Sequence, residues 1–125
     1  MTMTTTTLES LRARVGAGLA ARMPEHLQRL DWHADRLAVH QRERLRMLLC
    51  HAADHSPFHA RRLGRIEPDR FDLEDLRRLP VMTKSDMMAA FDDVVTDRRL
   101  RLDHVEDHLT RSASEPSLLH DEYVC

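Results

Sequence analysis

The stretch Ser56–Asp86 is dense in residues that start and stop helices, and it constrains the fold more than any other part of the sequence. Ser56 can cap a helix whose first residue is Pro57, because the amide hydrogen that proline lacks would have no helical partner at that position. Gly64 can end the same helix, since glycine is common just beyond a helix C-terminus. We therefore predict a short helix between Ser56 and Gly64.

Two further helix starts follow in the same stretch. Asp72 precedes Asp75 by three residues, and Thr83 precedes Asp86 by the same spacing, which is that of the capping box. Pro80 lies between the two pairs and forbids continuation of the earlier helix. These residues specify the path of the backbone and supply no catalytic group by themselves.

Composition narrows the fold class. The 125 residues fit one small domain, and only 4% of them are aromatic, so the core must come from Leu, Val, Met and Ala. That set as a whole suits helices better than sheets. We predict a mainly α fold with several short helices, one longer helix and a possible C-terminal β-strand. The formal net charge is −2, and the lack of a basic excess argues against nucleic acid as a partner.

The cysteines and the apolar runs bear on the compartment. Cys50 and Cys125 are the only cysteines, which does not indicate a disulfide framework and suits a reducing cytoplasm. No apolar run approaches the ~20 residues of a membrane span. Residues 1–7 lack the basic region and apolar core of a signal peptide. We expect a cytoplasmic protein with a flexible tail over residues 1–7.

The residue pattern of the N-terminal half predicts two helices separated by a short segment around Trp32. The first covers residues 8–23, starts at a capping box of Thr6 and Glu9, and ends before Pro24. Its apolar face could lie on a membrane or a partner, although packing on the rest of the protein is favoured. The second and stronger helix covers about residues 35–54. The apolar residues are Leu8, Leu11, Val15, Leu19 and Met23 in the first helix, and Leu37, Leu45, Leu48, Leu49, Ala52 and Ala53, with the stem of Gln41, in the second.

Shorter elements follow Pro80. A helix is predicted over residues 84–91, with Met87, Met88 and Phe91 as its apolar edge, and a turn with a short extended piece over residues 92–97. Asp103 with Glu106 predicts a capped helix over residues 104–110. The expected organisation is a tail (1–7), a helical region (8–111), and a loop with the start of a strand (112–125).

Nine histidines raise the question of a metal site. His104 and His108 are four apart on a predicted helix and could face one ion. Asp103, Asp107 or Asp121 could add a further ligand. The sequence between the two histidines is not His-Glu-x-x-His, and a solvated polar face is favoured. Two other groups also read as polar positions, His51, His55 and His59, which Pro57 interrupts, and His26, His33 and His40.

No nucleophile stands out. Cys50 adjoins His51, but neighbours on a helix point about 100° apart and cannot form a catalytic pair. Lys84 is the only lysine, and its place directly after a helix cap suggests a surface residue. We predict no catalytic, cofactor-binding or metal-binding residue in this chain.

The motif residues resemble a known family. His55-Ser56-Pro57-Phe58, Leu73-Glu74-Asp75-Leu76 and Leu79-Pro80-Val81-Met82-Thr83-Lys84-Ser85-Asp86 are similar to the N-terminal part of phenylacetate–CoA ligase-like enzymes. These belong to the adenylate-forming (AMP-dependent synthetase and ligase) superfamily. The resemblance covers Trp32 to the C-terminus, and residues 41–53 resemble the long helix before the family motif. His59 departs from the family, which usually carries Tyr there.

The resemblance implies an activity for a complete enzyme. Such an enzyme uses ATP and Mg²⁺ to convert a carboxylic acid to an acyl-adenylate and usually passes the acyl group to CoA. Its Ser/Thr/Gly-rich phosphate loop has no match here, because no glycine follows Gly64. We expect a chain truncated before that loop, with Glu122-Tyr123-Val124 as its lead-in strand and no activity or cofactor of its own. Its expected partner is the missing C-terminal remainder, or a second copy through self-association. The alternative is a stand-alone helical protein-interaction module.

Overall fold

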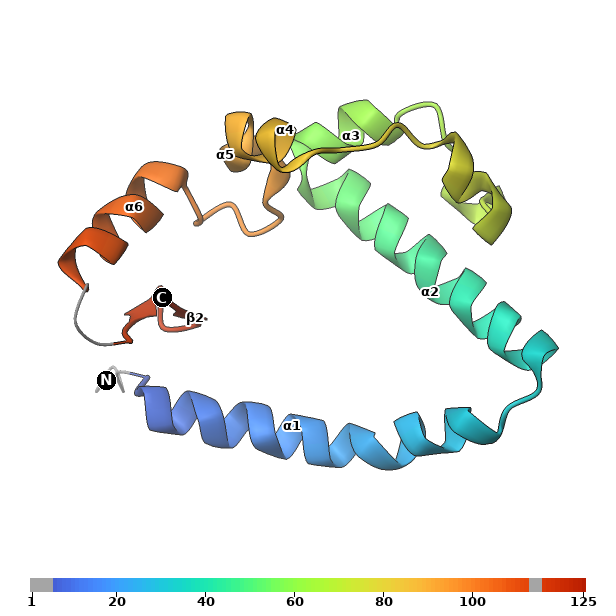
Figure 1. Cartoon of the computed structure of the whole chain (residues 1–125), viewed down its shortest axis with the longest axis horizontal. Helices are drawn as coiled ribbons and strands as arrows, with labels where there is room; N and C mark the ends of the chain where they lie inside the picture. Colours follow the sequence, from blue (N-terminus) through green and yellow to red (C-terminus); the bar gives the residue numbers. More distant parts are fainter. Residues whose placement is uncertain (1–5, 113–115) are drawn as a thin grey trace. The chain divides into compact units, whose positions relative to one another are not determined.

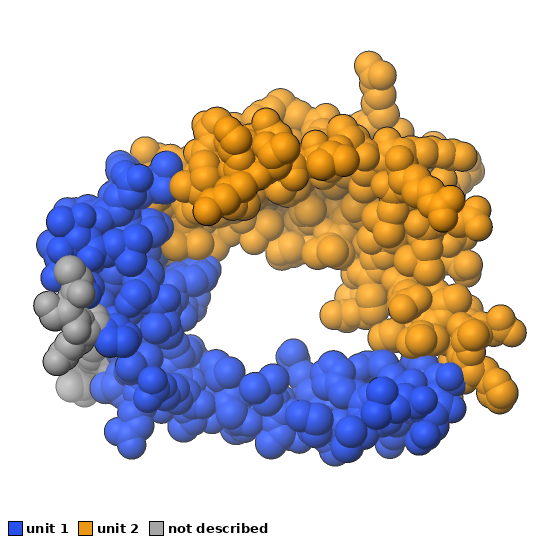
Figure 2. Space-filling model, viewed as in Figure 1, with its two compact units in different colours: residues 1–32, 102–125 blue, residues 33–101 orange. Residues whose placement is uncertain are grey.

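Residues 6–112 and 116–125 are described by the computed structural model of the chain (Figure 1). They are mainly helical, which confirms the predicted fold class. The chain divides into two compact units (Figure 2), unit 1 of Met1–Trp32 with Leu102–Cys125 and unit 2 of His33–Arg101. Within the described ranges, no helix combines the length and the apolar character needed to cross a membrane.

Unit 1 begins with the long helix α1 (Leu8–Gln28), which runs into a 3-10 turn, η1 (Arg29–Asp31). α1 starts where the sequence predicted, but its cap is Thr7 and not Thr6. The Ser10 amide donates to the Thr7 hydroxyl at 3.1 Å, and the Thr7 amide donates to the Ser10 hydroxyl at 3.0 Å. The predicted cap was wrong by one residue because a serine hydroxyl fills the role that we had given to Glu9.

α1 also continues through Pro24, where the sequence predicted its end. Proline removes the amide hydrogen that would bond to the carbonyl of Ala20, but this part of the helix is exposed and water can reach that carbonyl. Beyond the proline, Arg29 donates to Glu25 at 2.5 Å and lies 2.6 Å from Nδ1 of His26. Contacts at these spacings stabilise the final turn, so the helix ends later than expected.

The second part of unit 1 begins with helix α6 (Leu102–Arg111). It begins two residues earlier than predicted, and Asp103 lies in its first turn instead of capping it. The Asp103 carboxylate accepts a hydrogen bond from the amide of His104 at 3.0 Å. A carboxylate in the first turn also interacts favourably with the positive end of the helix dipole. This explains why a residue typical of a cap is tolerated inside the helix.

The single strand predicted near the C-terminus is a small hairpin of β1 (Leu118–Leu119) and β2 (Tyr123–Val124). The strands are antiparallel, with Leu118 opposite Val124. The turn places His120 and Asp121 at φ of 54° and 60°. His and Asp are among the few non-glycine residues that enter this left-handed region readily, so the segment can fold back and pair with itself.

Unit 2 is a succession of helices: α2 (Ala34–His55), α3 (Pro57–Leu63), the 3-10 helices η2 (Pro68–Arg70) and η3 (Leu73–Arg78), α4 (Lys84–Ala89) and α5 (Phe91–Val94). α2 matches its predicted range to within one residue at each end, and α3 lies between Ser56 and Gly64 as predicted. After α2 the chain turns at α3, runs back along α2 to η2 and η3, and then returns to α4 and α5, as the ribbon in Figure 1 shows.

The core of unit 2 is small. Leu49, Leu63 and Phe71 are buried, and Leu45, Ala52, Ile66 and Leu79 pack against them. The predicted stripe on α2 was wrong at Leu48, which is 63% exposed. Adjacent positions on a helix point about 100° apart, so Leu49 and Leu48 cannot both face a core of this size.

Two local predictions after Pro80 need correction. Residues 84–91 do not form one helix, because Ala90 (φ −125°, ψ 27°) separates α4 from α5. Residues 92–94, predicted as part of a turn, belong to α5, and the extended piece begins at Val95. The predicted tail (1–7) and the predicted loop at the start of residues 112–125 fall partly on residues 1–5 and 113–115, which lie outside the described residues.

Candidate functional site

Ser56 ties together two helices that are distant in sequence. It is 1% exposed, and its hydroxyl accepts a hydrogen bond from the amide of His59 at 3.3 Å, which caps α3. The same hydroxyl donates to the backbone carbonyl of Asp93 in α5 at 2.9 Å. Beside it, Arg61 forms an ion pair with the Asp93 carboxylate at 2.8 Å. The predicted cap is confirmed, and it also fixes where α5 meets α3.

Asp72 plays a similar double role at the start of η3. Its carboxylate accepts from the amide of Leu73 at 2.7 Å and from Nε of Arg42 in α2 at 3.1 Å, while its own amide donates to Asp75 at 3.0 Å. The Arg42 hydrogen bond, followed by that from Leu73, lowers the pKa of Asp72. Arg46 of α2 donates to the backbone carbonyl of Phe71 at 3.0 Å. Two arginines of α2 therefore fix the start of η3 against that helix.

The third predicted cap is also confirmed. The amide of Asp86 donates to the Thr83 hydroxyl at 3.1 Å, and the Asp86 carboxylate accepts from the Thr83 amide at 2.9 Å and from its hydroxyl at 2.6 Å. These hydrogen bonds from Thr83 lower the pKa of Asp86. The carboxylate is therefore held in its charged form at the N-terminus of α4.

The two capping carboxylates predict a loss of stability in acid. A carboxyl whose pKa is lower in the folded chain stabilises the fold above its unfolded pKa, and that stabilisation is lost as the pH falls through the folded value. The ordinary pKa of both carboxyls is about 3.8. We therefore expect the free energy of unfolding of unit 2 to decrease as the pH is lowered below that value. The double variant Asp72→Asn, Asp86→Asn should unfold more easily at neutral pH and lose less on acidification.

Circular dichroism during urea unfolding at pH 7 and pH 3 measures this difference. Glu74→Gln is the matched control, because Glu74 is an exposed carboxylate of η3 that caps no helix. An unchanged pH dependence in the double variant would show that other carboxylates dominate acid unfolding.

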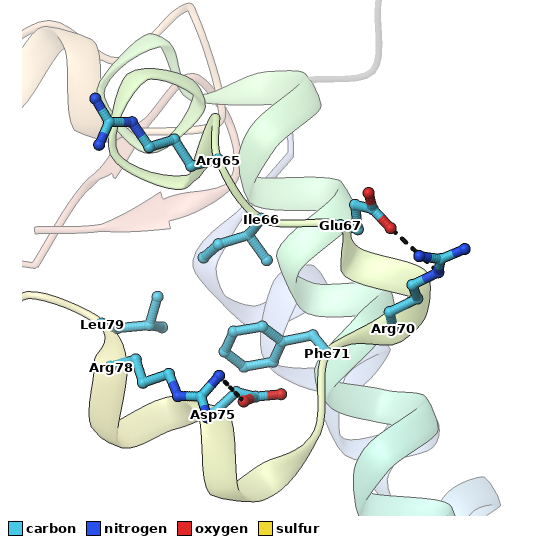
Figure 3. A pocket seen from close by; sticks show the side chains of 8 residues that line it. All are labelled: Arg65, Ile66, Glu67, Arg70, Phe71, Asp75, Arg78 and Leu79. Atoms are coloured by element: carbon cyan, nitrogen blue, oxygen red, sulfur yellow. Dashed lines mark ion pairs between the residues drawn. The ribbon is translucent and has the colours of Figure 1, made fainter.

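The chain from Arg65 to Leu79, which contains η2 and η3, lines a pocket in unit 2 with a volume of about 280 Å³. Its floor is apolar and consists of Ile66, Phe71 and Leu79, which point toward one another in Figure 3. Its rim is charged and contains two ion pairs, Glu67–Arg70 at 3.2 Å and Asp75–Arg78 at 3.1 Å, together with Arg65. The sequence did not indicate this pocket, because its floor residues come from three separate loops and turns.

The chemistry of this pocket favours binding over catalysis. Its lining includes no Ser, Thr, Cys, His or Lys, so it offers no conventional nucleophile. Its two carboxylates, Glu67 and Asp75, are each paired with an arginine of the same rim. An apolar floor with a guanidinium-rich rim can receive an apolar side chain from a partner.

Several of the histidines considered as metal ligands have other partners. His108 Nε2 is 2.7 Å from the Ser117 hydroxyl, and His51 and His55 stack with ring centroids 4.4 Å apart. Partial burial and then the charge of Arg62 lower the pKa of His59. Among the residues that the structure describes, no three His, Cys, Asp or Glu side chains gather as a metal site would require.

The remaining candidates occupy separate places. Cys50 is half-buried in α2, and Cys125 follows β2; both are free thiols. Lys84 is the exposed first residue of α4. Cys50 and Lys84 therefore lie on different helices of unit 2, and Cys125 belongs to unit 1. No protein-family model, curated protein or solved structure matches the chain.

Proposed function

We propose that the chain is the helical N-terminal segment of a phenylacetate–CoA ligase-like enzyme, and that it acts by docking on the nucleotide-binding part of that enzyme. The resemblance of residues 55–86 to the family motif supports the assignment. The same residues provide the caps that set the chain path of unit 2. Local structure and motif are thus consistent with each other.

The observation that carries the docking role is the apolar surface of unit 2. Its core is small, while large apolar side chains are exposed, namely Val39, Met47, Leu48, Leu76, Val81 and Met88. Val81, a motif residue, is 90% exposed. Covering one such side chain contributes about 1.5–3 kcal/mol, so a partner surface that covers several of them would be held firmly.

On this proposal the chemistry belongs to the partner. ATP, Mg²⁺ and CoA would bind to the remainder of the enzyme, which would form the acyl-adenylate, and the helical segment would contribute packing and position. The proposed setting is the cytoplasm, which suits the two free cysteines and an ATP-dependent reaction.

A complementation experiment tests this role. A phenylacetate–CoA ligase-like enzyme that lacks its matching N-terminal segment is mixed with the chain, and exchange of pyrophosphate into ATP is measured with an aryl acid. We expect the mixture to recover exchange that neither component shows alone. Leu48→Asp with Val81→Asp should abolish the recovery, whereas Glu43→Lys, on a different face of α2, should not. Absence of both complex formation and recovered exchange would contradict the proposal.

A second candidate is a helical interaction module that works without any ligase. The observation in its favour is α1, whose apolar residues from Val15 to Leu27 are about half exposed although they form a regular stripe. This surface belongs to unit 1 and lies outside the part that resembles the family.

A further inference from the structure

The apolar stripe of α1 and η1 is symmetric about its middle residue. Leu19 is the centre, and the other members lie four, eight and eleven residues away on both sides, as Val15 and Met23, Leu11 and Leu27, and Leu8 and Leu30. The six steps between successive stripe residues together span 22 positions, so one step averages ~3.7 residues, close to the 3.6 residues of one helical turn. The stripe therefore stays on one side of α1 and continues into η1.

Most of this stripe is uncovered within unit 1. Val15, Leu19, Met23 and Leu27 are 49–59% exposed, and Leu30 is 80% exposed. Leu11 is buried and Leu8 is partly buried. The unused apolar surface thus lies at the centre and C-terminal end of the stripe, while the N-terminal end is partly covered.

An apolar groove adjoins the N-terminal end of the stripe. It has a volume of about 390 Å³ and is lined by Leu8, Leu11, Arg12, Val15, Gly16, Leu19 and Val124, so β2 forms one wall. Gly16 has open space where a side chain would project. One end of the stripe therefore offers a groove, and the other end offers the protruding side chains Leu27 and Leu30.

The charges beside the stripe follow the same symmetry. Glu9 and Arg29 are each ten residues from Leu19, and Arg12 and His26 are each seven. If two copies of the helix run antiparallel, Glu9 faces Arg29, which also pairs with Glu25 of its own chain, and Arg12 faces His26 instead of a second Arg12. If they run parallel, Glu9 faces Glu9 and Arg29 faces Arg29, which places like charges together.

We propose that two copies of the chain associate through α1, antiparallel, with a two-fold axis at Leu19. Leu27 and Leu30 of each copy enter the groove beside Leu11 of the other, so both copies use the same surface, as two-fold symmetry requires. A second copy is the occupant that the symmetric stripe and the complementary charges specify. The pairing uses residues of unit 1 and does not depend on the proposed docking of unit 2.

Analytical ultracentrifugation of the full chain over about 1–100 μM tests the association. We expect a monomer–dimer equilibrium, and Leu19→Glu should raise the dissociation constant at least tenfold, because it places two carboxylates together on the axis. Arg14→Glu, on the opposite face of α1, is the control and should change it less than threefold. Because Leu19 is exposed in the single chain, helix content should survive the change, as circular dichroism can verify. A monomer throughout, or a dimer insensitive to Leu19→Glu, would overturn the proposal.

Disulfide trapping tests the direction. In a Cys50→Ser, Cys125→Ser background, chains carrying Val15→Cys and chains carrying Met23→Cys are mixed and oxidised. The antiparallel pair brings these two positions together, so the mixed disulfide should dominate. Two copies of residue 15 would lie about 12 Å apart along the axis, too far for a bond that needs Cα atoms within ~7 Å. A Val15→Cys chain that links mainly to itself would overturn the antiparallel arrangement.

Discussion

Replacing Phe71 by alanine should lower the free energy of unfolding of unit 2 by about 3–5 kcal/mol, the largest single effect we expect in this chain. Phe71 is 6% exposed and is one of the three buried residues of the core. Its ring also forms the floor of the pocket, between Ile66 and Leu79. Removing it joins the core to that pocket and leaves an opening that the short 3-10 helices on either side cannot close.

The core is small enough for this loss to be decisive. Domains of this size are stable by about 5–15 kcal/mol in total, and Leu49 and Leu63 alone cannot replace the contacts of the ring. We therefore expect Phe71→Ala to leave η2 and η3 detached from α2, while α2 and α3 keep part of their helical content. Phe71→Leu should lose less, because much of the volume remains.

Native-state hydrogen exchange measures this effect unit by unit, which matters because two units need not unfold together. Amides of α3 and η3 should lose protection in Phe71→Ala. The control is Leu48→Ala, also in unit 2 but at an exposed position, which should change stability by less than about 0.5 kcal/mol. Equal effects of the two substitutions would mean that Phe71 is not part of a folded core in solution.

The second large effect is expected for Ser56→Ala, at about 1–3 kcal/mol. The substitution removes the cap of α3 and, at the same time, the donor to the Asp93 carbonyl. Because Ser56 is almost fully buried, water cannot easily replace the lost hydroxyl, and the carbonyl of Asp93 remains without that donor. The Arg61–Asp93 ion pair is more exposed and is too weak to hold α5 alone.

Urea unfolding monitored by circular dichroism gives the size of this loss, and exchange at the α5 amides shows where it falls. Ser85→Ala is the matched control, since Ser85 is an exposed serine in α4. Thr83→Ala removes an exposed cap and should have an intermediate effect. A Ser56→Ala chain as stable as Ser85→Ala would show that the link between α3 and α5 contributes nothing.

The sequence alone determined the helix starts at which the capping residue and its hydrogen-bond partner lie within three residues of each other. Ser56, Asp72 and Thr83 cap the helices that their spacing predicted, because a capping bond joins groups that the chain already holds close together. The range of α2 and the mainly helical class followed for the same reason, since helical periodicity is a local property.

Tertiary contacts decided what local patterns leave open. Whether Leu48 or Leu49 faces the core depends on where α3 and Phe71 lie, and only the second is buried. Residues 118–124 could read as one strand, but the turn at His120 and Asp121 pairs them as a hairpin. The link from Ser56 to Asp93 spans 37 residues, and the pocket floor gathers residues from separate turns. These features depend on contacts between segments distant in sequence, and a local spacing carries no information about which distant segment a side chain will meet.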